Sequence, residues 1–287
     1  MANTARHTRP DQAAGLRRLL IPTALCSISF LGGRGRVGTS SVVLNLGHAL
    51  VHLGKRVLII DEFAGGGSLS NQYNPHPQLS MADVLHGKRH LEDIVIDISP
   101  DLSLLPFSSP ARPAPTTQPL AAQLEALLAH IDFVLIDSAA PTLTGVSSTL
   151  LASDHCVIVL ADRAEAITDA YTGIKLLSRE FGRHDAWLLI NRARDIDEAR
   201  ALYNRVASVA RQYTRAELGW LGFIPEDIAL SRAHQVLQSV IDRFPDAEAS
   251  QAALQLARAL TQLPMRDAQA STRQFVRRLF ASHDYPA

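Results

Sequence analysis

Hydrophobic and polar positions fall into two alternating kinds of segment along the chain. Short apolar runs rich in valine, isoleucine and leucine predict strands at residues 25–31, 56–61, 102–106, 133–137, 156–161, 186–191 and 218–224. Longer stretches with helical spacing of apolar residues predict helices at residues 40–53, 120–130, 167–181 and 197–215. Strands alternating with helices indicate an α/β fold with three layers, a mostly parallel sheet flanked by helices. Ligands of such folds bind beyond the carboxyl ends of the strands.

The composition fits a globular chain. Of the 287 residues, 47% are hydrophobic, and no apolar run is long enough to span a membrane. The 28 lysines and arginines balance the 28 aspartates and glutamates, which argues against direct nucleic-acid binding as a general function. Cys26 and Cys156 both lie in apolar runs and are expected to be buried thiols. The amino terminus lacks the apolar core of a signal peptide, so a cytoplasmic location is expected.

A glycine-rich loop follows the first predicted strand. Its candidate nucleotide-binding residues are Gly33, Arg34, Gly35, Arg36, Val37, Gly38, Thr39, Ser40 and Ser41. Glycines let backbone N–H groups converge on phosphate oxygens, and the start of the next helix adds positive potential. Ser40 stands where a hydroxyl would hold Mg²⁺. An ordinary turn is the alternative, and the strand before and helix after the loop favour phosphate binding.

This loop resembles the deviant phosphate loop of the MinD/ParA-type ATPases, G-K-G-G-V-G-K-[ST], and Asn45-Leu46 match the pair that follows it there. The resemblance implies a P-loop NTPase fold that binds ATP or ADP with Mg²⁺, as a monomer or a nucleotide-dependent homodimer. Arg34 takes the place of the lysine that reaches across such a dimer, and Arg36 replaces a glycine. Thr39 replaces the lysine that contacts the β- and γ-phosphates.

Other motifs of that family match in part. Asp61 and Asp137 end two predicted strands where the family places its magnesium and water site, so Ser40 and Asp137 are the implied magnesium ligands. For both aspartates a helix cap or turn is the alternative. Phe63 stands where the resemblance implies a water-activating aspartate, and Pro141, near the family's γ-phosphate-sensing glycine, lacks an N–H donor.

On the adenine side the resemblance implies contacts from Asn191, Pro225 and Asp227, with a turn asparagine as the alternative for Asn191. A charged hydrogen bond contributes about 1.5–3 kcal/mol. Replacement of the lysine by Thr39 therefore predicts phosphate binding weaker by roughly ten- to a hundredfold. Hydrolysis depends on positioned charge at the γ-phosphate, so we expect it to be weak or lost, and no catalytic residue is assigned.

Residues 1–20 form the first predicted part of the chain and contain a short amphipathic pattern, which docks on its own domain or is ordered by a partner. Five of its residues resemble the D-Q-A-x-x-L-R motif of the FlhG (FleN) branch of the MinD-type family, the flagellar-number regulators: Asp11, Gln12, Ala13, Leu16 and Arg17. The segments 166–175 and 80–94 resemble the same branch. The resemblance implies stimulation of the GTPase FlhF, with flagellar C-ring proteins or a flagellar transcription activator as further partners.

Residues 21–265 form the predicted MinD-like domain, and 266–287 a linker and an amphipathic helix. The residues of that helix expected to contact a membrane are Phe275, Val276, Arg277, Arg278, Leu279 and Phe280. An apolar stripe beside arginines suits an anionic membrane or a protein core. The MinD resemblance implies a membrane-targeting helix, hence a reversible location at the inner face of the cytoplasmic membrane.

The leading hypothesis is a regulator of flagellar number and placement that acts on the FlhF GTPase. One alternative is an active membrane-associated ATPase switch. Another is a degenerate relative serving cellulose secretion or pilus assembly, branches that lack the D-Q-A-x-x-L-R helix.

Overall fold

The computed structural model describes residues 25–33, 37–63, 68–73, 81–107, 118–142, 146–264 and 271–281. The strands of its single sheet are β1 (Cys26–Gly32), β2 (Val57–Asp61), β3 (Ile96–Ser99), β4 (Leu102–Pro106), β5 (Phe133–Ser138), β6 (His155–Leu160), β7 (Asp185–Ala193) and β8 (Glu217–Pro225). Their order is β3-β4-β2-β5-β1-β6-β7-β8, and β3 alone runs antiparallel to its neighbour. The predicted mostly parallel sheet is confirmed.

The helices are α2 (Thr39–His52), α3 (Leu69–Tyr73), α4 (Met81–Leu85), the 3₁₀ turn η1 (Leu91–Ile94), α5 (Gln118–Leu128), α6 (Ser148–Ala152), α7 (Ala164–Arg179), α8 (Ile196–Tyr213), α9 (Ile228–Gln235), α10 (Val240–Arg243), α11 (Glu248–Thr261) and α12 (Ser271–Phe280). The four predicted helices correspond to α2, α5, α7 and α8, with ends displaced by less than one helical turn. The sequence pattern did not predict β3, the short helices α3, α4 and α6, the turn η1 or the α9–α11 region.

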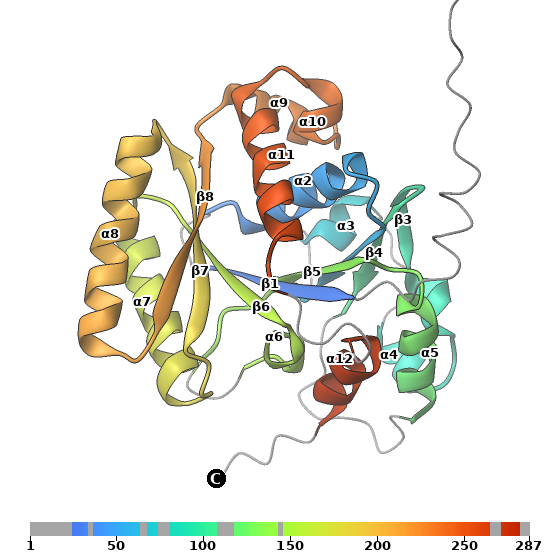
Figure 1. Cartoon of the computed structure of the whole chain (residues 1–287). Coiled ribbons are helices and arrows are strands. Elements are labelled where there is room, and N and C mark those ends of the chain that lie inside the picture. Colours follow the sequence, from blue (N-terminus) through green and yellow to red (C-terminus); the bar gives the residue numbers. More distant parts are fainter. Residues whose placement is uncertain are drawn as a thin grey trace, which may run out of the picture.

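Helices cover both faces of the sheet, as the alternation of strand side chains requires. Ile59 of β2 faces α2, where Gly47 permits close approach: a Cβ there would lie 3.2 Å from Ile59 Cδ1 and 3.0 Å from Leu102 Cδ1. Leu58 and Ile60 point to the opposite face and join a second core under α4, α5 and α12. Figure 1 shows α2 and α11 together above the sheet, α5 and α12 below it, and α7 and α8 beside β7 and β8.

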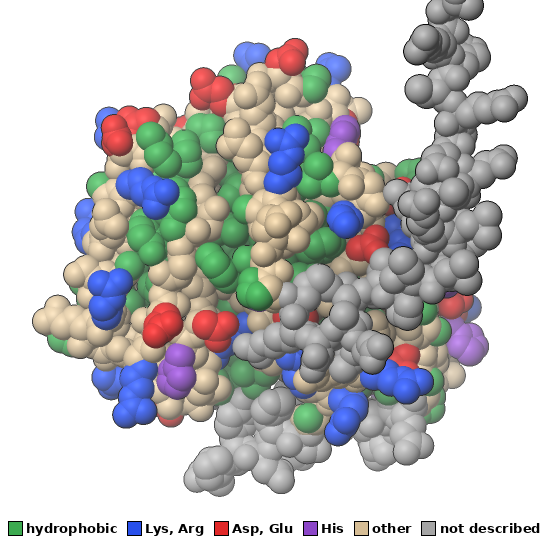
Figure 2. All heavy atoms as spheres, in the orientation of Figure 1, with side chains coloured by type: hydrophobic (Ala, Val, Ile, Leu, Met, Phe, Trp, Pro, Cys, Tyr) green, Lys and Arg blue, Asp and Glu red, His purple; other side chains and the backbone are tan. Residues whose placement is uncertain are grey.

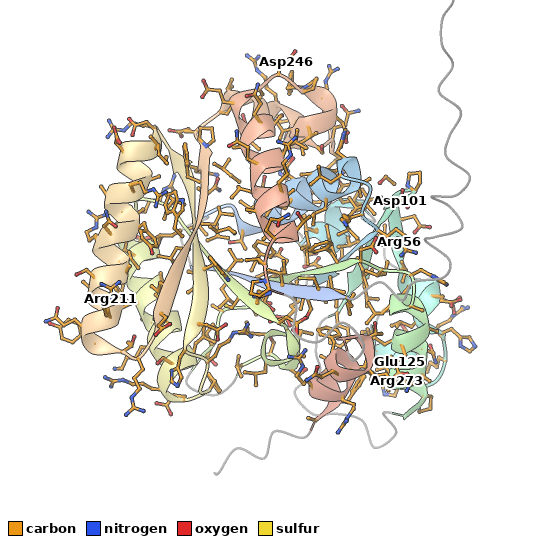
Figure 3. The ribbon with its side chains drawn as sticks, viewed as in Figure 1. Arg56, Asp101, Glu125, Arg211, Asp246 and Arg273 are labelled. Carbon is orange, nitrogen blue, oxygen red and sulfur yellow. The ribbon has the colours of Figure 1, made fainter. Side chains whose placement is uncertain are left out.

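The structure describes α12 packed on the domain, with the face that was expected to contact a membrane turned inward. Phe275, Val276 and Leu279 are 0%, 2% and 4% exposed, within the second core. Arg278 Nη2 donates a hydrogen bond to Asp154 Oδ1 at 2.7 Å. The apolar face is already covered by protein, so it has no surface left for lipid while the helix is packed. In Figure 3, the labelled Arg273 of α12 and Glu125 of α5 lie on neighbouring surfaces of these helices.

The remaining α12 residues of that expectation are at the margin of the packed face. Arg277 is exposed, and Phe280 is half-buried against the second core. Within the described ranges, no helix is both long and apolar enough to cross a membrane. The amino-terminal candidates, Asp11 to Arg17, lie outside the described residues. Figure 2 shows acidic and basic side chains interspersed over the visible face.

Candidate functional site

The described part of the glycine-rich loop has a backbone that its glycines require. Gly38 adopts a left-handed conformation, φ 86°, immediately before α2. A Cβ on Gly38 would lie 2.8 Å from Asn191 Nδ2, and one on Gly32 would lie 2.9 Å from a methyl group of Val37. Larger residues would therefore push the loop away from the helix start. Arg34, Gly35 and Arg36 lie outside the described residues.

Asn191 joins this loop to the end of β7. Its Nδ2 donates a 2.7 Å hydrogen bond to the carbonyl oxygen of Val37. Asn191 is 5% exposed, and its Oδ1 is buried without a hydrogen-bond partner in the described part of the chain. A buried acceptor without a partner costs free energy, so this oxygen is prepared for a donor from a ligand. An exocyclic amine of a purine is such a donor.

A cleft of about 1180 Å³ opens beside these groups. Its lining includes Gly33, Val37, Gly38, Thr39, Ser40, Ser41, Phe63, Ala140, Asn191, Arg192, Glu226 and Asp227. The cleft therefore lies at the carboxyl ends of β1, β2, β5, β7 and β8, the edge of a parallel sheet where ligands bind. The structure brings the described residues of the predicted loop together with Asn191 and Asp227 in one cavity, but not Pro225. Pro225 is buried and borders a separate groove of about 540 Å³ instead.

Asp137 has the properties of a cation ligand. It is fully buried at the end of β5, and neither carboxylate oxygen has a hydrogen-bond partner among the described residues. Burial raises the pKa of Asp137 to about 7; the adjacent Ser40 hydroxyl opposes this and the charge of Asp61 adds to it. Carboxylate and hydroxyl oxygens are ligands that Mg²⁺ prefers. The Ser40 and Asp137 pair therefore fits a magnesium ion, which would restore the ionised form.

Asp61 has a structural function instead. Its Oδ2 accepts hydrogen bonds from Ser70 N at 2.7 Å and Ser70 Oγ at 2.6 Å, and its Oδ1 accepts one from Phe63 N at 3.1 Å. These bonds tie the end of β2 to the first turn of α3. Both carboxylate oxygens accept hydrogen bonds from the backbone or side chain of the same segment, so Asp61 acts as a cap for α3 in the described structure, the alternative that the sequence left open.

Glu62, a buried acid near Asp137, was not singled out from the sequence. Its carboxylate accepts hydrogen bonds from Ala139 N, at 2.8 Å, and from the Thr149 hydroxyl. It thereby links β2, the segment after β5 and helix α6. Burial raises the pKa of Glu62 to about 7, and the Ala139 bond partly offsets the rise. Its place between Asp61 and Phe63, inside the family's D-x-D spacing, was the available signal.

The hydrolytic positions carry groups without catalytic chemistry. Phe63 is 42% exposed and lines the cleft where the resemblance implies an aspartate. Ala140 also lines it, followed by the buried Pro141. Asp227 caps α9 through Ala229 N at 2.8 Å and accepts from Ala249 N at 3.2 Å. Its side chain therefore holds the cleft wall together.

Comparison with known proteins identifies the family. The sequence profile described as cellulose biosynthesis protein BcsQ matches residues 25–260. The chain belongs to the BcsQ family of MinD/ParA-type proteins. Among curated relatives of this BcsQ-family chain, the antiactivator FleN of Pseudomonas aeruginosa is 29% identical over 83% of this chain and 87% of its own. The flagellum site-determining protein YlxH of Helicobacter pylori is 29% identical over 71% of each chain.

Solved structures agree on the fold. The septum site-determining protein MinD complexed with Mg-ADP from Pyrococcus horikoshii has a TM-score of 0.64 at 22% identity, covering 83% of this chain and 97% of that one. MinD from Aquifex aeolicus has a TM-score of 0.62 at 24% identity, covering 84% and 100%. The sequence resemblance to FlhG- and FleN-type members of the MinD/ParA group is confirmed, and so is the P-loop NTPase fold.

Proposed function

We propose that this protein regulates flagellar number and placement as a nucleotide-binding switch whose ATP hydrolysis is slow or absent. The observation that carries the proposal is the cleft itself. It is lined by the described part of the phosphate loop and by Asn191 with its unpaired oxygen, but has Phe63 at the water-activating position; the unpaired Asp137 carboxylate lies beside Ser40 of that lining. The flagellar part is supported by the similarity to FleN and YlxH.

Different groups of the cleft contact the phosphates, the base and the magnesium ion of the nucleotide. Backbone N–H groups at the start of α2 face the phosphates, and Asn191 Oδ1 accepts from the base. Ser40 and Asp137 would hold Mg²⁺, which supplies charge neutralisation for the phosphate chain when bound. Phe63 accepts no proton from water, so the attacking water is not activated there.

Nucleotide titration of the full-length protein, with and without Mg²⁺, tests the first half of this proposal. We expect ADP and ATP to bind, more tightly with Mg²⁺, and ATP turnover to stay far below that of a MinD/ParA-type ATPase with an intact phosphate-loop lysine. Sedimentation with ATP would report a nucleotide-dependent dimer. Comparable turnover would support an active ATPase switch instead, and absent binding would overturn the nucleotide-dependent function.

The proposed action on the FlhF GTPase rests on residues 1–20. Activation of a partner requires a presented helix rather than ATP hydrolysis, so it is compatible with a depleted site. A peptide of residues 1–20 is expected to stimulate GTP hydrolysis by FlhF, and Gln12→Ala to reduce the stimulation. An Arg6→Ala peptide, changed outside the motif, is the matched control. No stimulation by either the peptide or the full chain would refute this part.

Reversible membrane binding is proposed with one condition from the structure. The apolar face of α12 has to leave the second core before it can contact lipid, because its three central side chains are buried there. Liposome co-sedimentation should therefore be weak for the nucleotide-free protein and depend on residues 271–287. Unchanged binding after deletion of that segment would contradict the assignment.

The BcsQ family match favours cellulose secretion as a second candidate function. A deletion strain separates the two. Loss of correct flagellar number with normal cellulose secretion would support the flagellar function, and the reverse result would support the second candidate.

A further inference from the structure

The described lining of the cleft supplies little positive charge for the phosphates of a nucleotide. A nucleotide brings several negative charges, and Thr39 stands where the resemblance places the phosphate-binding lysine. Among the described residues that line the cleft, Arg192 is the single lysine or arginine. Glu226 and Asp227 in the same lining carry the opposite sign. A tightly bound phosphate therefore needs Arg192, or another source of charge outside the described residues.

The backbone aims Arg192 at the phosphate loop. Arg192 follows Asn191 at the end of β7 and has a left-handed conformation, φ 59°, which is uncommon for a residue with a side chain. The pairing of β7 with β8 shifts register between Asn191 and Ala193 at this point. A Cβ on Gly38 would lie 4.0 Å from both Nε and one Nη of Arg192. The guanidinium thus lies beside the first turn of α2.

The electrostatics of this place call for an anion. The amino-terminal end of a helix carries partial positive charge and stabilises negative ligands. An arginine beside that end is unfavourable unless an anion lies between the two. Arg192 has no ion pair or hydrogen bond within the described part of the chain and is exposed to the cleft. Guanidinium groups bind phosphate oxygens through two parallel N–H donors.

The neighbouring asparagine gives an independent sign of a ligand. Asn191 is 5% exposed, its Nδ2 is held by Val37, and its Oδ1 has no partner among the described residues. Consecutive residues therefore present an unpaired acceptor and an unpaired cation to one cavity. A nucleotide has both complements, an amine donor on its base and anionic oxygens on its phosphates.

We propose that Arg192 binds the phosphates of the nucleotide from the end of β7 and supplies the charge that Thr39 does not. This inference rests on the nucleotide binding of the proposed function and names a phosphate contact for it. Its position differs from that of a phosphate-loop lysine, because it approaches from the strand that carries the base-contacting asparagine. Binding is thereby retained while the contact that serves hydrolysis is not.

Calorimetric titration of the full-length protein with ADP and Mg²⁺, and separately with adenosine, tests the contact. Arg192→Ala is expected to weaken ADP binding by about ten- to a hundredfold and to change adenosine binding by less than about twofold. Arg192→Lys should restore part of the loss. Arg194→Ala is the matched control, because Arg194 follows on the same segment and pairs with Glu198 in solvent. Equal melting temperatures of the variants would show that folding is intact.

A restored lysine provides the second arm. If Arg192 substitutes for the lysine, Thr39→Lys tightens ADP binding, and Arg192→Ala costs less in that background than in the natural chain. ADP binding by Arg192→Ala equal to the Arg194→Ala control would overturn the inference and leave the proposed function standing. Equal losses for ADP and adenosine would also overturn it, because they indicate stacking on the base. A natural chain that binds no ADP would overturn nucleotide binding itself, and this contact with it.

Discussion

Replacing Phe275 tests whether α12 is an integral part of the domain. The ring is fully buried in the second core, next to side chains of α5 and α6. Removal of a buried phenylalanine ring costs about 3–5 kcal/mol through lost apolar burial and the cavity left behind. Arg277, two positions further along the same helix, is exposed and provides the control.

The loss should appear locally, because a helix of this length is marginal without its packing partner. A deficit of 3 kcal/mol or more is comparable with what one short helix gains by docking, so Phe275→Ala releases α12 rather than unfolding the sheet. We expect amide exchange across residues 271–280 to accelerate by roughly a hundredfold or more relative to Arg277→Ala. The core strands should keep their protection. Hydrogen exchange read by mass spectrometry measures both regions in one sample.

Phe275→Ala also distinguishes a packed α12 from an α12 that is free in solution and binds only lipid. If α12 were free in solution and met lipid alone, Phe275→Ala and Arg277→Ala would give the same exchange rates across 271–280. That result would refute the packed arrangement and the reasoning built on it.

Three further perturbations have defined outcomes. The folded-state pKa of Glu62, about 7, lies above its ordinary value of 4.5, so folding takes up a proton between these pH values and stability falls as pH rises through that window. Glu62→Gln should weaken this pH dependence of the melting temperature. Melting temperatures of the natural chain that stay constant from pH 5 to 8 would contradict the prediction. Thr39→Lys combined with Phe63→Asp is expected to raise steady-state ATP turnover well above either single change, and additive or absent gains would show that another group limits hydrolysis. Asp61→Ala removes the three hydrogen bonds that this carboxylate accepts, two of them from Ser70, and should lower the free energy of unfolding by about 2–4 kcal/mol in urea titration. Glu217→Ala, at an exposed acid at the start of a strand, is the control. A loss for Asp61→Ala smaller than that of the control would contradict the structural function of Asp61.

Features set by local pattern were predictable from the sequence. The central parallel strands β1, β2, β5 and β6 are buried on both faces, so each appears as a continuous apolar run such as 133–137, and the phosphate loop has its glycines at fixed spacing. Helices α9 and α10 were missed because they are short and their apolar residues do not repeat over a full window. Helix α11 was missed although Ala249, Ala253, Leu256 and Leu260 have the helical spacing that predicts it. Arg192 could not be singled out either. The direction of the Arg192 side chain towards the phosphate loop depends on a left-handed backbone and a register shift between β7 and β8, which residue identity does not reveal.

Two sequence interpretations had alternatives that only a partner elsewhere in the chain distinguishes. Asp61 at a strand end suits a metal or a cap, and Ser70, nine residues later, decides for the cap.

An apolar stripe with arginines suits lipid or a core, and for α12 the deciding group is Asp154. Its Oδ2 already accepts from Ser27 N and Oγ, which leaves Oδ1 for Arg278. A buried carboxylate that loses its cation is costly. Lipid must therefore compensate for an unpaired Asp154 as well as for lost apolar packing. Release of α12 in the natural chain therefore costs the Asp154–Arg278 ion pair in addition to the apolar packing.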